Sequence, residues 1–117
     1  MATNAYSLSQ AKAQPECVPF AIYDGETLVG FCMYGMDVGD REYWIYRLMI
    51  DRAYQSRGYG REALSLLLER LQADCSHHMV YLSCNPENAW GRALYESVGF
   101  QPDGREVHGE IVYRKVW

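Results

Sequence analysis

The sequence lacks the features that mark membrane-spanning, secreted and nucleic-acid-binding proteins. No run approaches the roughly 20 apolar residues that cross a bilayer, and the N-terminus has neither the basic start nor the apolar centre of a signal peptide. Basic residues form no cluster and the formal net charge is −4, so neither nucleic acid nor a membrane is an expected partner. The four cysteines include no Cys-x-x-Cys pair, which predicts reduced thiols in a cytoplasmic protein.

Several catalytic motifs are missing as well. The chain has no Gly-x-Ser-x-Gly nucleophile motif and no Gly-x4-Gly-Lys-Ser/Thr phosphate loop. Cys75, His77, His78 and Cys84 do not form the two tightly spaced ligand pairs of a typical zinc site, so we expect no metal.

What is present suits one domain over residues 1–117. Hydrophobic residues make up 49% of the chain, enough for a packed core. The order of the predicted elements is typical of an α/β fold, in which a mixed sheet carries helices on its faces and residues 42–84 form a parallel crossover. Apolar patterns predict helices at residues 4–14, 58–73 and 89–98, and strands at 20–23, 28–34, 42–50, 79–84, 101–107 and 110–116.

Three finer expectations concern burial. The strand at 42–50 is rich in aromatic and branched residues, which indicates a central strand buried on both faces near its end. The helix at 58–73 places its leucines and Ala63 at helical spacing. The helix at 89–98 has an apolar stripe formed by Trp90, Ala93, Leu94 and Val98.

The segment from Leu48 to Leu64 is the most informative stretch. An apolar strand ends, a short loop follows, and Gln55-x-x-Gly58-x-Gly60 opens a helix. The first turn of a helix presents unpaired N–H groups that suit a phosphate, and glycines let an anion approach the backbone. A plain strand-to-helix connection explains Gly-x-Gly alone equally well. The third glycine of a dinucleotide fingerprint is absent, because Arg61-Glu62-Ala63 follows.

This pattern resembles the acetyl-coenzyme A signature of the GNAT superfamily of N-acetyltransferases, Gln/Arg-x-x-Gly-x-Gly/Ala. A second family motif follows at the expected distance, with Asn88 and the core Leu-Tyr-Glu-x-x-Gly-Phe at residues 94–100. The resemblance covers about residues 18–117 and implies a GNAT-like fold that uses acetyl-CoA. The implied reaction is direct transfer of acetyl to a primary amine, a small molecule, with no covalent enzyme intermediate.

The resemblance also implies roles for individual residues. Tyr95 would donate a proton to the departing thiolate, although a core tyrosine is the alternative. Asn88 would bind the pantetheine arm, or cap a helix. A backbone N–H, that of Met49, would polarise the thioester carbonyl. The full set of expected cofactor-binding residues is Leu48, Met49, Ile50, Gln55, Ser56, Arg57, Gly58, Tyr59, Gly60, Arg61, Asn88 and Tyr95.

The general base and the acceptor site are assigned to acidic residues at or before the central strand. We expect Glu42 to take the proton of the amine, directly or through a water molecule. Asp37, Asp40 and Glu42 would bind a second positive charge of the substrate, or simply solvate a loop. Within the family the chain looks most like the bacterial spermine/spermidine acetyltransferases, which predicts a polyamine acceptor.

One departure from the family pattern concerns the N-terminus. Family members begin with a strand and a helix before the segment equivalent to residues 4–14, and this chain starts too late to contain them. A truncated chain, a short variant or a homodimer that completes the site each accounts for this, and an exposed sheet edge at residues 20–23 favours the homodimer. The alternative function is an acetyl-CoA-binding or interaction module with an incomplete substrate site.

Overall fold

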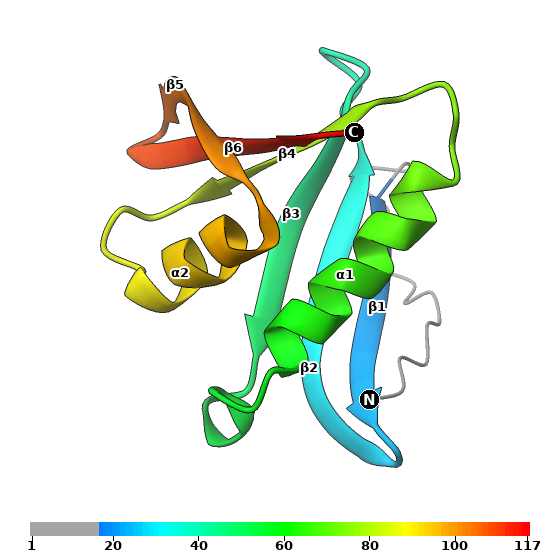
Figure 1. Cartoon of the computed structure of the whole chain (residues 1–117), viewed down its shortest axis with the longest axis vertical. Helices are drawn as coiled ribbons and strands as arrows, with labels where there is room; N and C mark the ends of the chain where they lie inside the picture. The colour runs from blue at the N-terminus through cyan, green and yellow to red at the C-terminus, as the bar shows by residue number, and fades with distance from the viewer. Residues whose placement is uncertain (1–16) are drawn as a thin grey trace.

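The computed structural model describes residues 17–117, which form one mixed six-stranded sheet and two α-helices (Figure 1). The predicted helix at residues 4–14 lies outside the described residues. The strands are β1 (Cys17–Asp24), β2 (Thr27–Met36), β3 (Tyr43–Ile50), β4 (Met79–Cys84), β5 (Gln101–Val107) and β6 (Glu110–Val116). A short 3₁₀ helix, η1 (Arg52–Tyr54), precedes α1 (Tyr59–Gln72), and α2 (Ala89–Val98) follows β4.

The sheet order is β1-β2-β3-β4-β6-β5, with one parallel pair. The β1–β2 and β2–β3 pairs are antiparallel, and Gly25 adopts a positive φ of 61° in the tight turn between β1 and β2. The β3–α1–β4 crossover makes β3 and β4 parallel, as expected. The hairpin of β5 and β6 then places β6 beside β4, so β5 forms the far edge.

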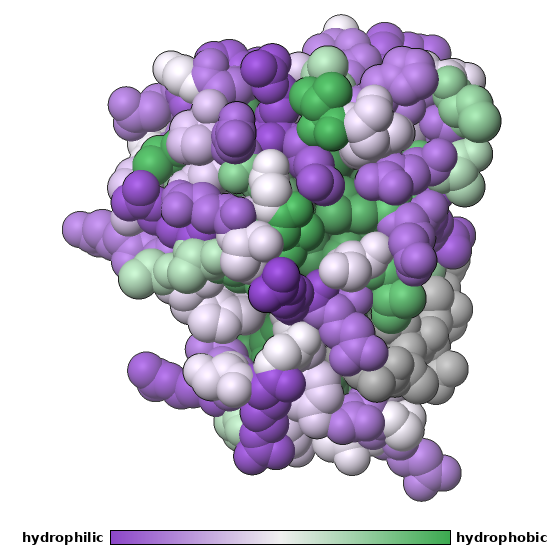
Figure 2. Space-filling view, in the orientation of Figure 1, coloured by the Kyte–Doolittle hydropathy of each residue, from purple (hydrophilic) through white to green (hydrophobic). Residues whose placement is uncertain are grey.

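The helices cover one side of the sheet. Helix α1 buries Ala63, Leu64, Leu67, Leu68 and Leu71 against it, which confirms the predicted apolar face. The predicted stripe of α2 is partly wrong, because α2 buries Gly91 and Tyr95 while Ala93 is exposed. The helix is turned so that the motif tyrosine points inward. Apolar surface gathers in a hollow between the two helices, surrounded by polar residues (Figure 2). Among residues 17–117, no helix is long and apolar enough to cross a membrane.

Strand β3 is central, as predicted, but it is not buried on both faces near its end. Ile45, Leu48 and Ile50 are buried, whereas Arg47 and Met49 are exposed, Met49 by 54%. Both described helices lie on the other side of the sheet, so neither covers the face on which Arg47 and Met49 lie. The strand also contains a β-bulge. The adjacent β2 residues Met33 and Tyr34 pair with Arg47 and Ile45 of β3, respectively. Tyr46 is therefore an extra residue between Ile45 and Arg47. An extra residue reverses the alternation of side chains and bends the strand.

Candidate active site

The bulge in β3 coincides with a gap in the sheet. The parallel pairing of β3 with β4 runs from Tyr43 to Ile45 and then stops, although both strands continue (Figure 1). The gap opens into a cavity of about 290 Å³. Its lining comes from both strands, from the loop after β4, from α2 and from β6: Ile45, Tyr46, Arg47, Leu48, Leu82, Ser83, Cys84, Asn85, Asn88, Tyr95 and Glu110. Beyond Ile45, the β4-facing edge of β3 is therefore left without a strand partner among the described residues.

Tyr95 lines this cavity from α2. Its side chain is only 7% exposed and packs edge-on against Phe100 and beside Tyr113. Among the residues that the structure describes, the Tyr95 hydroxyl has no hydrogen-bond partner. Burial foremost, and then electrostatic interaction with Cys84 and Glu110, raises the pKa of Tyr95 to about 12. The side chain therefore keeps its proton at neutral pH and can donate it within the cavity.

Asn88 lines the same cavity and also caps α2. Its Oδ1 accepts a hydrogen bond of 3.0 Å from the Gly91 N–H. A Cβ at Gly91 would lie 2.6 Å from Asn88 Nδ2, so the glycine makes room for this cap. The capping alternative is confirmed, and the Nδ2 group keeps donor capacity for a ligand.

The loop that follows β3 is organised by side-chain hydrogen bonds. Asp51 caps η1 by accepting from the Ala53 N–H at 3.0 Å, and Gln55 Nε2 donates to the Ile50 carbonyl at 3.0 Å. Ser56 and Gly58 both adopt positive φ, 66° and 83°. These bonds and turns direct the chain from the end of β3 into the first turn of α1.

The N-terminus of α1 has the character of an anion site. Its N-cap residue is Gly58, which has no side chain. The N–H groups of the first turn therefore receive no side-chain hydrogen bond from the N-cap residue. Arg61 lies in this first turn and adds positive charge to the helix dipole. The loop and α2 enclose a second, smaller cavity of about 80 Å³, lined by Ile50, Tyr54, Gln55, Ser56, Gly58, Tyr59, Gly60, Arg61, Trp90 and Leu94.

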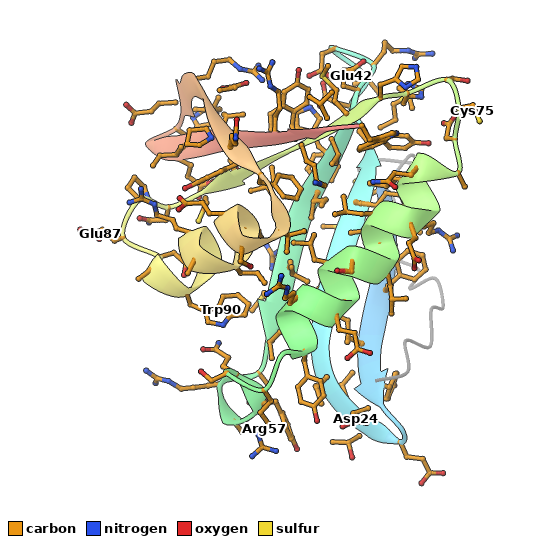
Figure 3. The ribbon with its side chains drawn as sticks, viewed as in Figure 1. Asp24, Glu42, Arg57, Cys75, Glu87 and Trp90 are labelled. Atoms are coloured by element: carbon orange, nitrogen blue, oxygen red, sulfur yellow. The ribbon has the colours of Figure 1, made fainter. Side chains whose placement is uncertain are left out.

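The two motif glycines are needed at their positions for different reasons. A Cβ at Gly58 would meet nothing within 4 Å, so this glycine supplies positive φ and open space for a ligand. A Cβ at Gly60 would lie 3.1 Å from both Trp90 and Leu94, so Gly60 lets α2 approach α1. Trp90 projects from α2 toward the loop (Figure 3).

Two of the expected cofactor-binding residues line neither cavity. Met49 lies instead in a shallow groove of about 400 Å³ with residues 28–31. The guanidinium of Arg57 lies 5.6 Å from the centre of the Tyr54 ring at the lower end of the molecule (Figure 3). Tyr59 lines the smaller cavity, and its hydroxyl donates to Asp24 of β1, which raises the pKa of Tyr59.

The three acids expected to serve the substrate shape the turn between β2 and β3. Asp37 Oδ2 accepts from the N–H groups of Gly39 and Asp40, and Asp40 accepts from the Glu42 N–H and from Trp44 Nε1. None of these acids lines the cavity that contains Tyr95. Glu42 precedes Ile45, the first cavity-lining residue of β3, by roughly 10 Å along the strand, at the opposite end of the sheet from Arg57 (Figure 3). The structure thus does not bring these acids to Tyr95.

The sequence analysis missed several residues of the cavity. Glu110 lies at the start of β6 and accepts a hydrogen bond of 2.6 Å from the Ser83 hydroxyl. Cys84 is buried, which raises the pKa of its thiol. These residues carry no motif, and only the placement of β6 beside β4 brings them together.

Two of the residues considered for a metal site contact other protein groups. His77 Nδ1 lies 3.2 Å from Asp74 Oδ2, and the Cys84 thiol donates to the Asn85 carbonyl at 3.5 Å. No group of three or more His, Cys, Asp or Glu side chains is placed to hold a metal ion within residues 17–117. All four cysteines are free thiols.

Comparison with known proteins decides the family. The family model described as "Acetyltransferase (GNAT) family" matches residues 2–100. The chain belongs to the GNAT acetyltransferase family. The sequence-based expectation of an acetyl-CoA-dependent N-acetyltransferase is thereby confirmed at the level of the family.

A relative with an assigned activity and two solved structures place this GNAT chain more closely. Spermine/spermidine N(1)-acetyltransferase of Bacillus subtilis (strain 168) is 33% identical over 115 residues, which cover 92% of this chain and 76% of the relative. The PaiA N-acetyltransferase of Thermoplasma acidophilum, solved with coenzyme A, aligns with a TM-score of 0.74 at 17% identity over 92% of this chain. This chain covers 65% of the PaiA structure, about two thirds of its length. The aminoglycoside acetyltransferase AAC(6')-Ib, also solved with coenzyme A, aligns with a TM-score of 0.79 at 17% identity, over 93% of this chain and 71% of that one.

Proposed function

We propose that this protein transfers the acetyl group of acetyl-CoA to a primary amine by direct attack of the amine on the thioester. The observation that carries the proposal is the gap between β3 and β4, which opens into a cavity lined by the protonated Tyr95, with the N-terminus of α1 at a second cavity lined by β3 and α2. The GNAT family assignment supports the same reaction. A new C–N bond forms, the C–S bond breaks, and coenzyme A leaves as its thiol.

The loop from Gln55 to Arg61 is the proposed site for the pyrophosphate of the cofactor. Helix α1 has 14 residues, so its dipole is well developed, and Arg61 lies in its first turn. The open space beside Gly58 admits an anion to the backbone. Ser56, Tyr59 and Gly60 complete the site, and Arg57 contributes charge from outside it.

The edge of β3 is the proposed binding surface for the pantetheine arm. Beyond Ile45, β3 has no strand partner on its β4 side among the described residues. The backbone groups of Leu48 and Ile50 that face this side can therefore pair with an extended ligand as an added strand would. The Met49 carbonyl lies instead against Gly30 of β2, and the N–H and C=O of one strand residue point to the same side, so the Met49 N–H faces β2. We therefore assign the contact with the thioester carbonyl to a backbone N–H of Leu48 or Ile50 and not to that of Met49. The free Nδ2 donor of Asn88 faces the same cavity.

Tyr95 is the proposed acid. Its pKa, raised to about 12, keeps the hydroxyl protonated until negative charge develops on the departing sulfur. A hydroxyl without a partner among the described residues can turn toward that sulfur without breaking a bond in the protein.

A polyamine such as spermidine or spermine is the proposed acceptor. The activity named for the Bacillus subtilis relative supports this class, and a net charge of −4 favours a cationic substrate. Asp37, Asp40 and Glu42 would then attract the distal ammonium groups from the β2–β3 turn. The competing function is an acetyl-CoA-binding module without turnover.

An acetylation assay separates these possibilities. The protein is incubated with acetyl-CoA and, in turn, spermidine, spermine, an aminoglycoside and a peptide with a free N-terminus, and release of the coenzyme A thiol is followed. The proposal predicts the highest kcat/KM for the polyamines. Binding of acetyl-CoA with no turnover on any amine would instead establish the binding module.

We also propose that the protein is a homodimer. Strand β1 is one edge of the described sheet, and edge strands are templates for pairing between chains. A dimer mass at micromolar protein concentration by light scattering supports the proposal, and a monomer mass contradicts it.

A further inference from the structure

The cavity that contains Tyr95 holds a carboxylate that the family motifs do not include. Glu110 is the one acidic residue among the residues that line this cavity. It lies at the start of β6, directly after the tight turn at His108 and Gly109, where both residues have positive φ. The position of its side chain is thus fixed by a hairpin rather than by a long loop.

Hydrogen bonding and sheet register place Glu110 beside the end of β4. Ser83 donates to Glu110 Oε1 at 2.6 Å, and the neighbouring pair Cys84 and Ile111 are partners in the ladder. In β4 the buried residues Val80, Leu82 and Cys84 alternate with Ser83, so Ser83 faces the side of the sheet away from the helices. Because Glu110 accepts a hydrogen bond from Ser83, its carboxylate lies on the same side of the sheet as Ser83. Tyr95 comes from α2, on the other side.

Glu110 forms no ion pair with the described residues, 17–117, although Arg47 of β3 also lines the cavity. Over the same range, the Ser83 hydroxyl is the one hydrogen-bond donor to the carboxylate. The negative charge of Glu110 acts on two other side chains that line the cavity, because it helps to raise the pKa of both Tyr95 and Cys84. An ammonium group that entered the cavity would meet this unpaired carboxylate.

We propose that Glu110 binds the attacking ammonium group and accepts its proton, and that Ser83 positions the carboxylate. This inference rests on the proposed function. The ammonium gives its first proton to Glu110, and the free amine attacks the thioester carbonyl. The second proton leaves the nitrogen to solvent as the amide forms. Tyr95 gives its proton to the departing sulfur and regains one from solvent, so the two exchanges balance. Glu110 then releases its proton to solvent.

The proposal assigns the two reactants to opposite sides of the sheet. Tyr95 protonates the sulfur of coenzyme A from the helix side of the sheet. Glu110 binds the amine from the other side, at the gap between β3 and β4. The acids of the β2–β3 turn keep a role only in attracting distal charges of a long acceptor. The assignment of Glu42 as base is thereby replaced by a residue that lines the cavity.

The test compares Glu110→Gln, Glu110→Ala and Glu106→Gln with the wild-type chain, using spermidine as acceptor. Glu106 is an exposed acid of β5 outside the cavity and serves as the matched control. We expect Glu110→Gln to lower kcat by about 100-fold, the low end of general-base contributions, with the Kd of acetyl-CoA unchanged within about twofold. We expect added formate to restore part of the activity of Glu110→Ala, which a merely structural role would not allow.

The outcomes separate this inference from the function on which it rests. An active wild-type enzyme with a fully active Glu110→Gln variant overturns the role of Glu110 and leaves the acetyltransferase function standing. The role of Glu110 is also overturned if Glu110→Gln loses acetyl-CoA binding together with activity, or if formate rescues nothing. A wild-type chain that binds acetyl-CoA but acetylates no amine overturns both proposals.

Discussion

At the scale of single residues, Tyr95 and Tyr113 show how one side-chain type serves two purposes in the same core. The Tyr113 hydroxyl donates to Glu96 at 2.8 Å and accepts from Arg92 at 3.2 Å, which ties β6 to α2. The Tyr95 hydroxyl has no such partner among the described residues, and the Tyr95 side chain lines the cavity. Tyr113 is therefore structural, whereas Tyr95 is available for chemistry.

This contrast gives a prediction for Tyr95→Phe. The change removes only the hydroxyl, so we expect turnover to fall by about 100-fold, the range of general-acid contributions. The free energy of unfolding should change by less than about 0.5 kcal/mol, and the Kd of acetyl-CoA should stay the same. Steady-state kinetics, calorimetry and urea unfolding measure the three quantities.

Tyr113→Phe is the matched control for this change. It removes a hydroxyl that has two protein partners and should cost about 1 kcal/mol of stability, with turnover nearly unchanged. If Tyr95→Phe keeps wild-type turnover, Tyr95 has no role as the acid and is a core residue only.

Residues within motifs were predictable and residues brought in by topology were not. Asn88 and Tyr95 stand in a recognisable pattern, and the structure places both at one cavity. Glu110 follows Ser83 by 27 residues and meets it only because β6 inserts between β4 and β5. No local sequence pattern predicts that β6 lies between β4 and β5. The helix-capping role of Asn88 was also predictable, because asparagine is a favoured N-cap residue.

At the scale of elements, β2 and β3 approach each other closely at Gly30. A Cβ at Gly30 would lie 2.3 Å from the Met49 carbonyl oxygen and 2.8 Å from Ile50 Cδ1. The neighbour is backbone, which cannot move aside without distorting the strand. Because β3 borders the proposed active site, this contact helps to fix the position of the cofactor-binding edge.

We therefore expect Gly30→Ala to destabilise the fold. Overpacking of this kind costs about 1–3 kcal/mol, which urea unfolding can measure. Thr27→Ala, at an exposed position of the same strand, should change the free energy of unfolding by no more than about 0.5 kcal/mol. Equal stabilities for Gly30→Ala and the wild-type chain would contradict the close approach of β2 to β3.

The connection between α1 and β4 is held by Asp74. This carboxylate accepts from the Tyr43 hydroxyl at 2.7 Å and from the Ser76 N–H at 3.0 Å, and it contacts His77. These interactions, the Tyr43 hydrogen bond foremost, lower the pKa of Asp74 to about 2. The network fixes the loop after α1 to the start of β3.

The lowered pKa predicts a pH dependence of stability. A carboxylate whose pKa is lower in the folded state contributes stability above its unfolded value of about 3.9. That contribution is lost as the pH falls toward about 2. Asp74→Asn should therefore be less stable than the wild-type chain at pH 7, and the difference should shrink as the pH falls from 4 toward 2. A difference that is independent of pH over this range would contradict the role of the Asp74 charge.

The elements themselves were largely readable from the sequence. The strand Met79–Cys84, the helix Ala89–Val98 and the final two strands begin and end at the predicted residues. Turn residues and apolar periods carry that information locally. The bulge at Tyr46 has no local signal, because it reflects how β3 pairs with β2. The bulge lies where β3 and β4 begin to separate. The alternating burial at the end of β3 was missed because an apolar sequence does not show that both described helices lie on one side of the sheet.

At the scale of the whole molecule, the sheet is divided into two halves that meet at the gap. Strands β1, β2 and β3 with α1 form one half, and β4, β6 and β5 with α2 form the other (Figure 1). The halves are joined by the short parallel pairing at residues 43–45 of β3. The two cavities lie along the junction, and β3 and α2 line both. A long, thin ligand with a phosphate group at one end fits that arrangement.

Calorimetric titration with acetyl-CoA tests this account most directly. The account predicts saturable binding of about one molecule per chain, and binding about tenfold weaker for Arg61→Glu, which reverses a charge in the first turn of α1. Arg114→Glu, at an exposed position of β6 outside both cavities, should bind as the wild-type chain does. Absence of binding to the wild-type chain, or equal binding by Arg61→Glu, would contradict the account.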